Sequence, residues 1–202
     1  QQEAEVARQQ AELKSLRNQI SPHFLLNTLN NIYALAAIST ERTQGAVMQL
    51  SRLLRHTLYD NQSEMVTLRS EADFITSYID LMKLRLAANV RIETSIDIAQ
   101  NSRTMVAPLL FISLIENAFK HGVAGTASCI ISVSLHEGNG SIVCDIINSN
   151  HPKLSSDRSG HGIGLNLVRQ RLETIYPGQY EWIKGVEADG LYHSKITIPA
   201  VS

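Results

Sequence analysis

Pro22 is the residue that most restricts how the first third of this chain can fold. Apolar residues follow a helical spacing on both sides of it, but the downstream stripe is rotated by well over a quarter turn. A proline inside a helix removes a hydrogen bond and clashes with the preceding turn, at a cost of about 3 kcal/mol, whereas the first helical position after a Ser cap tolerates it. Either arrangement makes the backbone irregular just before His23.

The helix expected after Pro22 has one apolar and one polar side. At about 100° per residue, the apolar stripe and the polar face lie opposite one another. The stripe consists of Leu25, Leu29, Ile32 and Ala36, and the polar face of His23, Asn27 and Asn30. A single histidine on such a face is most often a hydrogen-bonded core residue. Two motifs further along the chain favour a phosphate acceptor instead.

A second amphipathic helix is expected around Leu50, with apolar positions at Val47, Leu54 and Leu58. Together the two helices predict a hairpin that buries its stripes by pairing with a second copy into four helices, so we expect a homodimer. The polar segment 59–64 is the expected boundary between a helical domain, residues 1–62, and a second domain, residues 63–202. Ser70 with Asp73 is expected to cap the next helix, through about Leu86.

The second domain has the pattern of mixed helices and strands, which predicts an α+β chain. A strand is expected over 90–98, a helix over 108–121, and a hairpin over 130–136 and 142–147 that turns on 137–140. A helix ending near 176–178 is followed by two closing strands over 180–186 and 192–199, joined by a turn at Asp189 and Gly190.

Composition excludes some classes of partner. The 202 residues carry a net charge of −1, so no basic surplus exists for direct binding of nucleic acid. Cys129 and Cys144 lie in strand-like runs without metal-ligand spacing, which predicts core residues and suits a reducing compartment. No segment approaches the roughly 20 apolar residues of a membrane span, and the amino terminus is no signal peptide.

The second motif is an apolar helix, 113–122, whose last turn becomes polar. The amide oxygen of Asn117 can ligate Mg²⁺, and Lys120, three residues on, can meet phosphates that share the metal. The alternative is a helix end whose cations suit its dipole. That alternative explains Lys120 and His121 but not the pair Glu116 and Asn117.

The third motif places Gly160, Gly162 and Gly164 directly before an amphipathic helix. Backbone amides at a helix amino terminus, uncovered by side chains, bind phosphate oxygens. A plain loop-to-helix junction explains the glycines equally well. The spacing is not that of a Rossmann or P-loop signature, since no hydrophobic strand abuts it and no Gly-Lys-Ser/Thr follows.

Together and in this order, the three motifs resemble those of the LytS-type sensor histidine kinases. Residues 19–30 resemble the family's acceptor motif, 116–122 its N box, and Gly162, Gly164 and Leu165 with 169–172 its G box. The resemblance covers roughly residues 11–200 and implies a helical dimerisation and phosphoacceptor region followed by a GHKL (Bergerat) α/β sandwich that binds ATP. It further implies the cytoplasmic catalytic part of a bacterial inner-membrane protein.

The resemblance also implies residue roles. His23 would take the γ-phosphoryl group of ATP, Asn117 would hold Mg²⁺, Lys120 and His121 would lie near the phosphates, and the glycines would form the hinge of a lid. The phosphoryl group would pass to an aspartate of a response regulator, which in this family usually carries a LytTR-type DNA-binding domain. Asn27, one turn beyond His23, has the spacing at which some kinases position water for dephosphorylation of their regulator.

One departure from the family concerns adenine. Most GHKL proteins have an Asp in the strand before the lid, followed by glycines, and here Asn148 stands in the matching stretch. An amide still accepts a hydrogen bond but lacks the charge that strengthens it. This departure leaves one other function open, a degenerate kinase that acts as a dimeric nucleotide-binding scaffold.

A GHKL ATPase is a further alternative. It is disfavoured, because the ATPases have a catalytic Glu where this chain has Ser113.

Overall fold

The computed structural model describes residues 22–59, 65–84, 86–151 and 163–201. These residues divide into two compact units. The first holds α2 (Pro22–Ala36), α3 (Thr40–Tyr59) and the end of α4 (Leu68–Lys83) from Ser77 onward. The second holds the start of α4 and everything described after residue 86. The predicted division into 1–62 and 63–202 stays a prediction.

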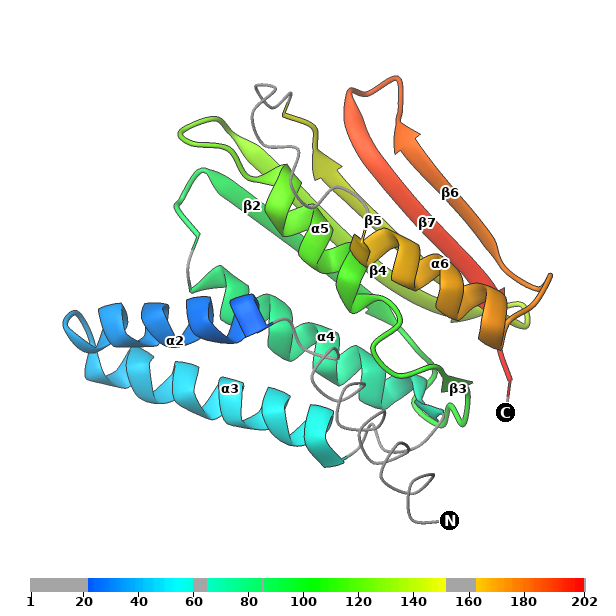
Figure 1. The fold of residues 1–202 in the computed structure, drawn as a ribbon, viewed down its shortest axis with the longest axis horizontal. Helices are drawn as coiled ribbons and strands as arrows, with labels where there is room; N and C mark the ends of the chain where they lie inside the picture. Colours follow the sequence, from blue (N-terminus) through cyan, green and yellow to red (C-terminus); the bar gives the residue numbers. More distant parts are fainter. Residues whose placement is uncertain (1–21, 60–64, 85, 152–162, 202) are drawn as a thin grey trace, which may run out of the picture. The chain divides into compact units, whose positions relative to one another are not determined.

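In the helical unit, α2 and α3 lie side by side (Figure 1), and α2 begins at Pro22 as the cap argument allows. The observed burial matches the predicted stripes only in part. Thr28 and Leu35 are buried on α2, and Ala46, Leu50 and Leu53 on α3, whereas Leu29 and Val47 are exposed. The hairpin of this single chain therefore leaves part of its apolar surface uncovered.

Alternating apolar residues build the sheet of the second unit, which has the strand order β2-β4-β5-β7-β6. Its strands are β2 (Val90–Asp97), β4 (Cys129–Gly138), β5 (Ser141–Ser149), β6 (Glu181–Val186) and β7 (Leu191–Pro199). β2 runs parallel to β4, and the other neighbours are antiparallel. The strand predictions are close to these bounds, and the chain turns between β4 and β5 on Asn139 and Gly140, both at positive φ as a type I′ turn requires.

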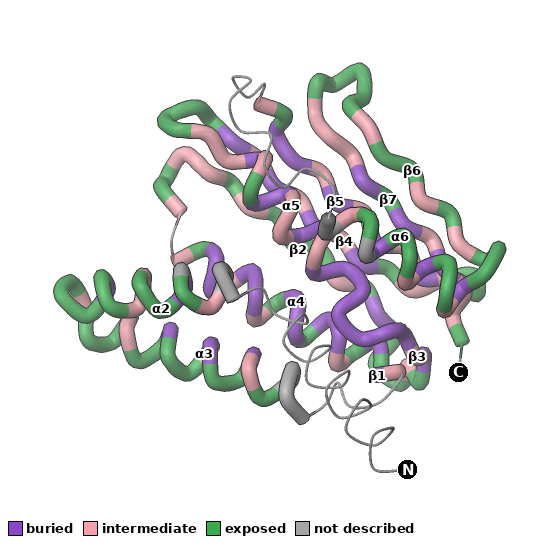
Figure 2. Tube along the Cα trace, viewed as in Figure 1, coloured by how far each residue is buried: buried purple, intermediate pink, exposed green. Residues whose placement is uncertain are grey.

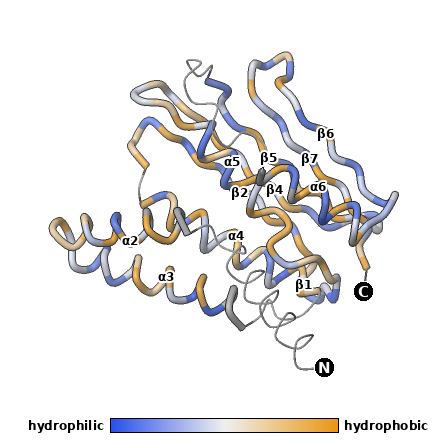
Figure 3. The backbone as a smooth tube through the Cα atoms, viewed as in Figure 1, coloured by the Kyte–Doolittle hydropathy of each residue, from blue (hydrophilic) through white to orange (hydrophobic). Residues whose placement is uncertain are grey.

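Helices α5 (Ile112–Gly122) and α6 (Ile163–Ile175) cover one face of this sheet (Figure 1). Buried positions, purple in Figure 2, recur along the central strands β4, β5 and β7. Many of these positions are apolar (Figure 3), and Ile131, Cys144 and Ile196 are among the buried residues. Cys129 and Cys144 are both buried and unbridged, as predicted.

A second, short sheet pairs β1 (Val66–Thr67) with β3 (Met105–Val106). Because β1 leads directly into α4 and β3 leads into the segment before α5, this pairing brings the first turn of α4 beside that segment. The Oγ1 atom of Thr67 accepts a hydrogen bond from the amide of Ser70 at 3.2 Å, so Thr67 rather than Ser70 caps α4.

None of the helices in the described ranges is both long and apolar enough to cross a membrane. The described residues also contain no group of three or more His, Cys, Asp or Glu side chains that could hold a metal ion.

Candidate functional site

Helix α5 separates an apolar from a polar side. Ile115, Ala118 and Phe119 are among the residues that it buries against the sheet. Asn117 and His121 are half-buried, and Lys120 is exposed. Lys120 and His121 stand in the last turn of α5, where the negative end of the helix dipole favours basic side chains. The structure therefore places all three predicted Mg²⁺ and phosphate residues on α5, with Asn117 near its middle and Lys120 and His121 in its last turn.

Gly122 ends α5 at a point of very close packing. A Cβ built on Gly122 would lie 2.9 Å from the Cβ of Asn148 and 3.4 Å from Cγ1 of Ile131. Real Cβ contacts at the first of these distances essentially do not occur, so only glycine fits without a shift of β5. The end of the second motif and the Asn148 position on β5 are therefore in direct contact.

Asn148 lies on the helix-covered face of β5, only 3% exposed. Its Nδ2 donates a 2.9 Å hydrogen bond to the backbone carbonyl of Ser149. With the amide group committed in this way, Oδ1 is the atom that remains as an acceptor.

Glu116 precedes Asn117 on α5 and is half-buried. Burial raises its pKa from 4.5 to about 7, because the ionised carboxylate loses solvation there. A carboxyl group beside the candidate metal ligand is thus able to change its protonation near neutral pH.

Other site predictions fall at the limit of the described residues. Gly160 and Gly162 lie outside them, so their roles stay predictions. Gly164 and Leu165 belong to the first turn of α6, and the Leu165 side chain is half-buried.

His23 and Asn27 lie in the first two turns of α2, in the helical unit. The structure describes the backbone of both residues but not their side chains. Their predicted roles also stay predictions.

Sequence reasoning misplaced the start of α5. The predicted helix over 108–121 begins only at Ile112, because Leu109 has φ 55°, in the left-handed region that a leucine rarely adopts. Phe111 is the N-cap residue and supplies no side-chain cap hydrogen bond.

The polar groups of this segment are instead bound by side chains from α4 and α6. Oε2 of Glu71, on α4, accepts a 2.9 Å hydrogen bond from the Leu109 amide. Arg171, on α6, donates to the carbonyl of Pro108 at 2.6 Å and to that of Leu109 at 3.3 Å. The hydroxyl of Tyr176, just past α6, accepts from the Ala107 amide at 3.1 Å.

Glu71 is fully buried, and burial raises its pKa to about 7, against the lowering effects of the Leu109 amide and the Arg171 guanidinium. Its second oxygen, Oε1, has no hydrogen-bond partner among the residues that the structure describes. The sequence contains one sign that another element must bind the amides at the start of α5: none of the four residues 108–111 before the helix is Ser, Thr, Asp or Asn, the usual N-cap residues.

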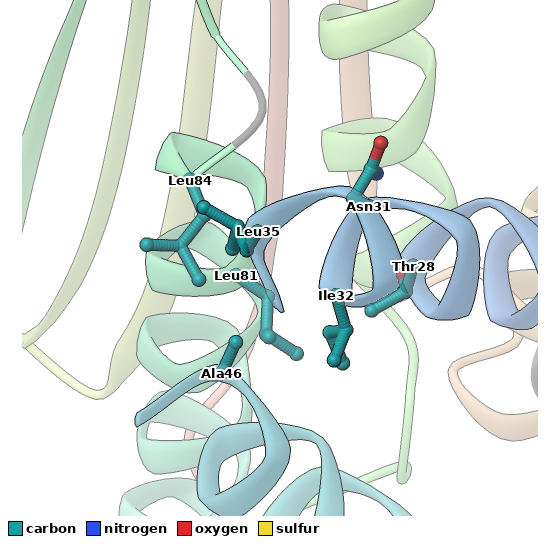
Figure 4. A pocket seen from close by; sticks show the side chains of 7 residues that line it. All are labelled: Thr28, Asn31, Ile32, Leu35, Ala46, Leu81 and Leu84. Atoms are coloured by element: carbon teal, nitrogen blue, oxygen red, sulfur yellow. The ribbon is translucent and has the colours of Figure 1, made fainter. Parts of the chain in front are cut away.

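A small cavity of about 10 Å³ lies in the described part of the helical unit (Figure 4), with room for about one water molecule. It is lined by Thr28, Asn31, Ile32, Leu35, Ala46, Leu81 and Leu84. Within the described part of the chain, Oγ1 of Thr28 and Nδ2 of Asn31 are buried without a hydrogen-bond partner. The cavity is far too small for a nucleotide and includes none of the predicted site residues.

Comparison with protein families finds a match to the histidine kinase family over residues 11–90. Two similar curated proteins are the sensor histidine kinase/phosphatase LytS of Staphylococcus aureus, 28% identical over 179 residues, and the sensor protein LytS of Bacillus subtilis, 26% identical over 181 residues. The matches cover 82% and 84% of this chain, which spans about 30% of the length of each relative.

Two solved structures share the fold. The catalytic domain of the histidine kinase ThkA matches with a TM-score of 0.50 and 16% identity, over 69% of this chain and all of that one. The histidine kinase domain of a blue-light activated histidine kinase from Erythrobacter litoralis matches with a TM-score of 0.50 and 14% identity, over 98% of this chain and 96% of that one. These likenesses confirm the expected α+β fold of the second unit.

Proposed function

From the similarity of this chain to the LytS-type sensor histidine kinases, we propose that it transfers the γ-phosphoryl group of ATP to His23 and then to an aspartate of a response regulator. The observation that carries the proposal is the contact between Gly122 and Asn148 at the end of the helix that presents Asn117 and Lys120. This contact supports the proposal because it sets the end of α5, the helix with the candidate metal and phosphate residues, against the candidate adenine residue on β5.

The residues present fit a magnesium nucleotide. Mg²⁺ retains water and takes few protein ligands when phosphates supply the others, so one amide oxygen from the half-buried Asn117 is a suitable donor. The exposed ammonium group of Lys120 is free to reach phosphate oxygens. Bound Mg²⁺ would neutralise charge on the phosphates.

In the proposed transfer, a neutral imidazole nitrogen of His23 forms a bond to the γ-phosphorus. The bond from that phosphorus to the β,γ-bridging oxygen breaks, ADP leaves, and the imidazole loses its proton to water. Most of the catalysis in such transfers comes from positioning and charge neutralisation. Lys120, His121 and the amides of the Gly160, Gly162, Gly164 and Leu165 segment would supply these on the protein side.

We assign adenine recognition to Asn148. Its Oδ1 is the acceptor left after Nδ2 binds Ser149, and an acceptor is what the adenine amino group requires. The missing carboxylate charge predicts weaker base selectivity than in relatives that have Asp there.

We also propose a homodimer formed through α2 and α3. Several large apolar side chains on these helices are exposed, namely Leu26, Leu29, Tyr33, Val47 and Met48. Pairing with a second copy would remove them from water in a four-helix arrangement.

Three finer proposals rest on the resemblance of the motifs to those of the LytS-type family. The Staphylococcus aureus relative is named a kinase/phosphatase, and we propose that Asn27 supports dephosphorylation of the regulator. We further propose a regulator of LytTR type and a place for this chain as the cytoplasmic part of an inner-membrane protein. An Asn27→Ala protein that dephosphorylates its regulator at the normal rate would overturn the first of these.

The test of the function is incubation with Mg²⁺ and γ-labelled ATP beside a His23→Ala variant. Acid-labile, alkali-stable label in the protein, absent from the variant, is the expected result. Release of labelled phosphate without protein-bound label would favour a GHKL ATPase. ATP binding with neither outcome would favour the dimeric nucleotide-binding scaffold.

A further inference from the structure

Leu109 is tightly constrained by its surroundings. It is buried, its φ of 55° is unfavourable for a side chain with a Cβ, and both of its backbone polar groups are bound by charged side chains. Such conformations persist where the surroundings force them, and they cluster at functional sites.

The two charged side chains come from different helices. Glu71, on α4, accepts a hydrogen bond from the N–H of Leu109. Arg171, on α6, donates a hydrogen bond to the carbonyl of Leu109. Arg171 also binds the carbonyl of Pro108, so its planar fork bridges two consecutive carbonyls that no helix satisfies. The buried carboxylate and guanidinium also attract one another, as their mutual effects on pKa indicate.

The position of Glu71 and Arg171 in the fold lets them affect the direction of α5 as well as the stability of the unit. The segment that they fix is the direct lead into α5, which has no cap of its own. A carboxylate at the amino-terminal end of a helix also compensates the positive end of the helix dipole. The direction in which α5 starts at Ile112 determines where Asn117 lies, about one and a half turns later.

We propose that Glu71 and Arg171 are positioning residues for phosphoryl transfer: by holding Leu109 from opposite sides, they set α5 in the direction that Asn117 needs and tie it to α6. The tie joins the carboxyl-terminal half of α6 to the segment that leads into α5, so a shift of Leu109 would move the start of α5 relative to α6. The proposal rests on the proposed function, since Asn117 and the glycines take their roles from it.

The test compares Arg171→Met and Arg171→Lys with the control Arg103→Lys, an exposed arginine in the same unit. Unfolding curves first fix a temperature at which all four proteins are folded. Affinity for Mg²⁺-ATP is then measured by titration, and KM and kcat by formation of acid-labile label. In the folded Arg171→Met protein we expect Mg²⁺-ATP affinity to fall about tenfold or more, because small misplacements of positioning groups have effects of that size.

Arg171→Lys should recover part of the loss, since an ammonium group can bind one of the two carbonyls. The control should match the wild type. A folded Arg171→Met protein with wild-type affinity, KM and kcat would overturn the proposal.

The same measurements separate a wrong kinase function from a wrong positioning role for Arg171. If the wild type binds Mg²⁺-ATP but forms no phosphohistidine, the kinase function fails, while the affinities of the variants still decide the role of Arg171. If the wild type does not bind Mg²⁺-ATP at all, both proposals are wrong.

Discussion

Gly122 and Asn148 approach so closely that a Cβ on the glycine would lie 2.9 Å from the Cβ of the asparagine. The contact joins the end of α5 to β5 and leaves no room for a methyl group. Any side chain at this glycine must therefore move either the helix end or the Asn148 amide.

Replacing Gly122 with Ala should weaken both folding and nucleotide binding. We expect a loss of about 1–3 kcal/mol in the free energy of unfolding, typical of overpacking, together with weaker Mg²⁺-ATP binding. Gly45→Ala is the matched control, because Gly45 lies within α3 with nothing within 4 Å of its Cβ position. That variant should gain up to about 1 kcal/mol from helix propensity. Equal urea midpoints for the two variants would contradict the packing argument.

Restoring the family's usual acid by Asn148→Asp should destabilise this chain. The amide donates to the Ser149 carbonyl, and an ionised carboxylate there would face that carbonyl with no proton to share. We expect a cost of about 1–3 kcal/mol at pH 7, for burial of an unsatisfied group, and recovery at low pH when the carboxyl is protonated. Urea unfolding at pH 5 and pH 7 measures both. A variant at least as stable as the wild type at pH 7 would show that Asn148 has other surroundings.

Stability should fall as pH rises from about 4.5 to about 7. Burial raises the pKa of both Glu71 and Glu116 from 4.5 to about 7, so the native state holds these protons where the unfolded chain has lost them. The stabilisation is complete below pH 4.5 and is lost as pH approaches 7. For Glu71 its size is on the order of 3 kcal/mol at most. Arg171, Tyr176 and Cys144 are the titratable groups coupled to it.

Glu71→Gln and Glu116→Gln should each flatten this pH dependence, because neither amide titrates. Glu173→Gln, which removes an exposed carboxylate on α6, is the control and should leave the slope unchanged. Denaturant unfolding between pH 4.5 and 8 measures all three. A Glu71→Gln curve parallel to that of the wild type would show that the buried carboxyl keeps an ordinary pKa.

Thr28→Val should stabilise the helical unit by about 1 kcal/mol. The buried Oγ1 of Thr28 has no partner, and an unsatisfied hydroxyl costs free energy that a methyl group of similar shape does not. Thermal unfolding measures the change. A destabilised variant would instead indicate a water molecule in the cavity, bound by both Thr28 and Asn31.

Leu29→Lys combined with Met48→Lys should convert the proposed dimer to a monomer. Both side chains are more than half exposed in the single chain, and a charge on each would oppose burial between copies. Sedimentation velocity measures the change in mass. Ile183→Lys, at a similarly exposed position on β6, is the control. A monomeric wild type would contradict the dimer proposal directly.

The sequence predicted the elements whose signals lie within a few residues. Alternation of apolar residues located β2, β4, β5, β6 and β7, and Asn139 with Gly140 specified the hairpin turn because few other residues adopt positive φ. The polar end of α5 was visible for the same reason, since Asn117, Lys120 and His121 interrupt a local apolar pattern. The motifs were therefore predictable, although their roles in catalysis stay predictions.

Tertiary structure alone decided how those elements begin and what they touch. The start of α5 depends on Glu71, 38 residues earlier than Leu109, and on Arg171, 62 residues later, and no local pattern encodes such partners. The need for glycine at position 122 likewise arises from β5, which only folding brings against it. Periodicity and turn chemistry act within one element, whereas caps from other helices and close backbone contacts exist only once the layers have packed.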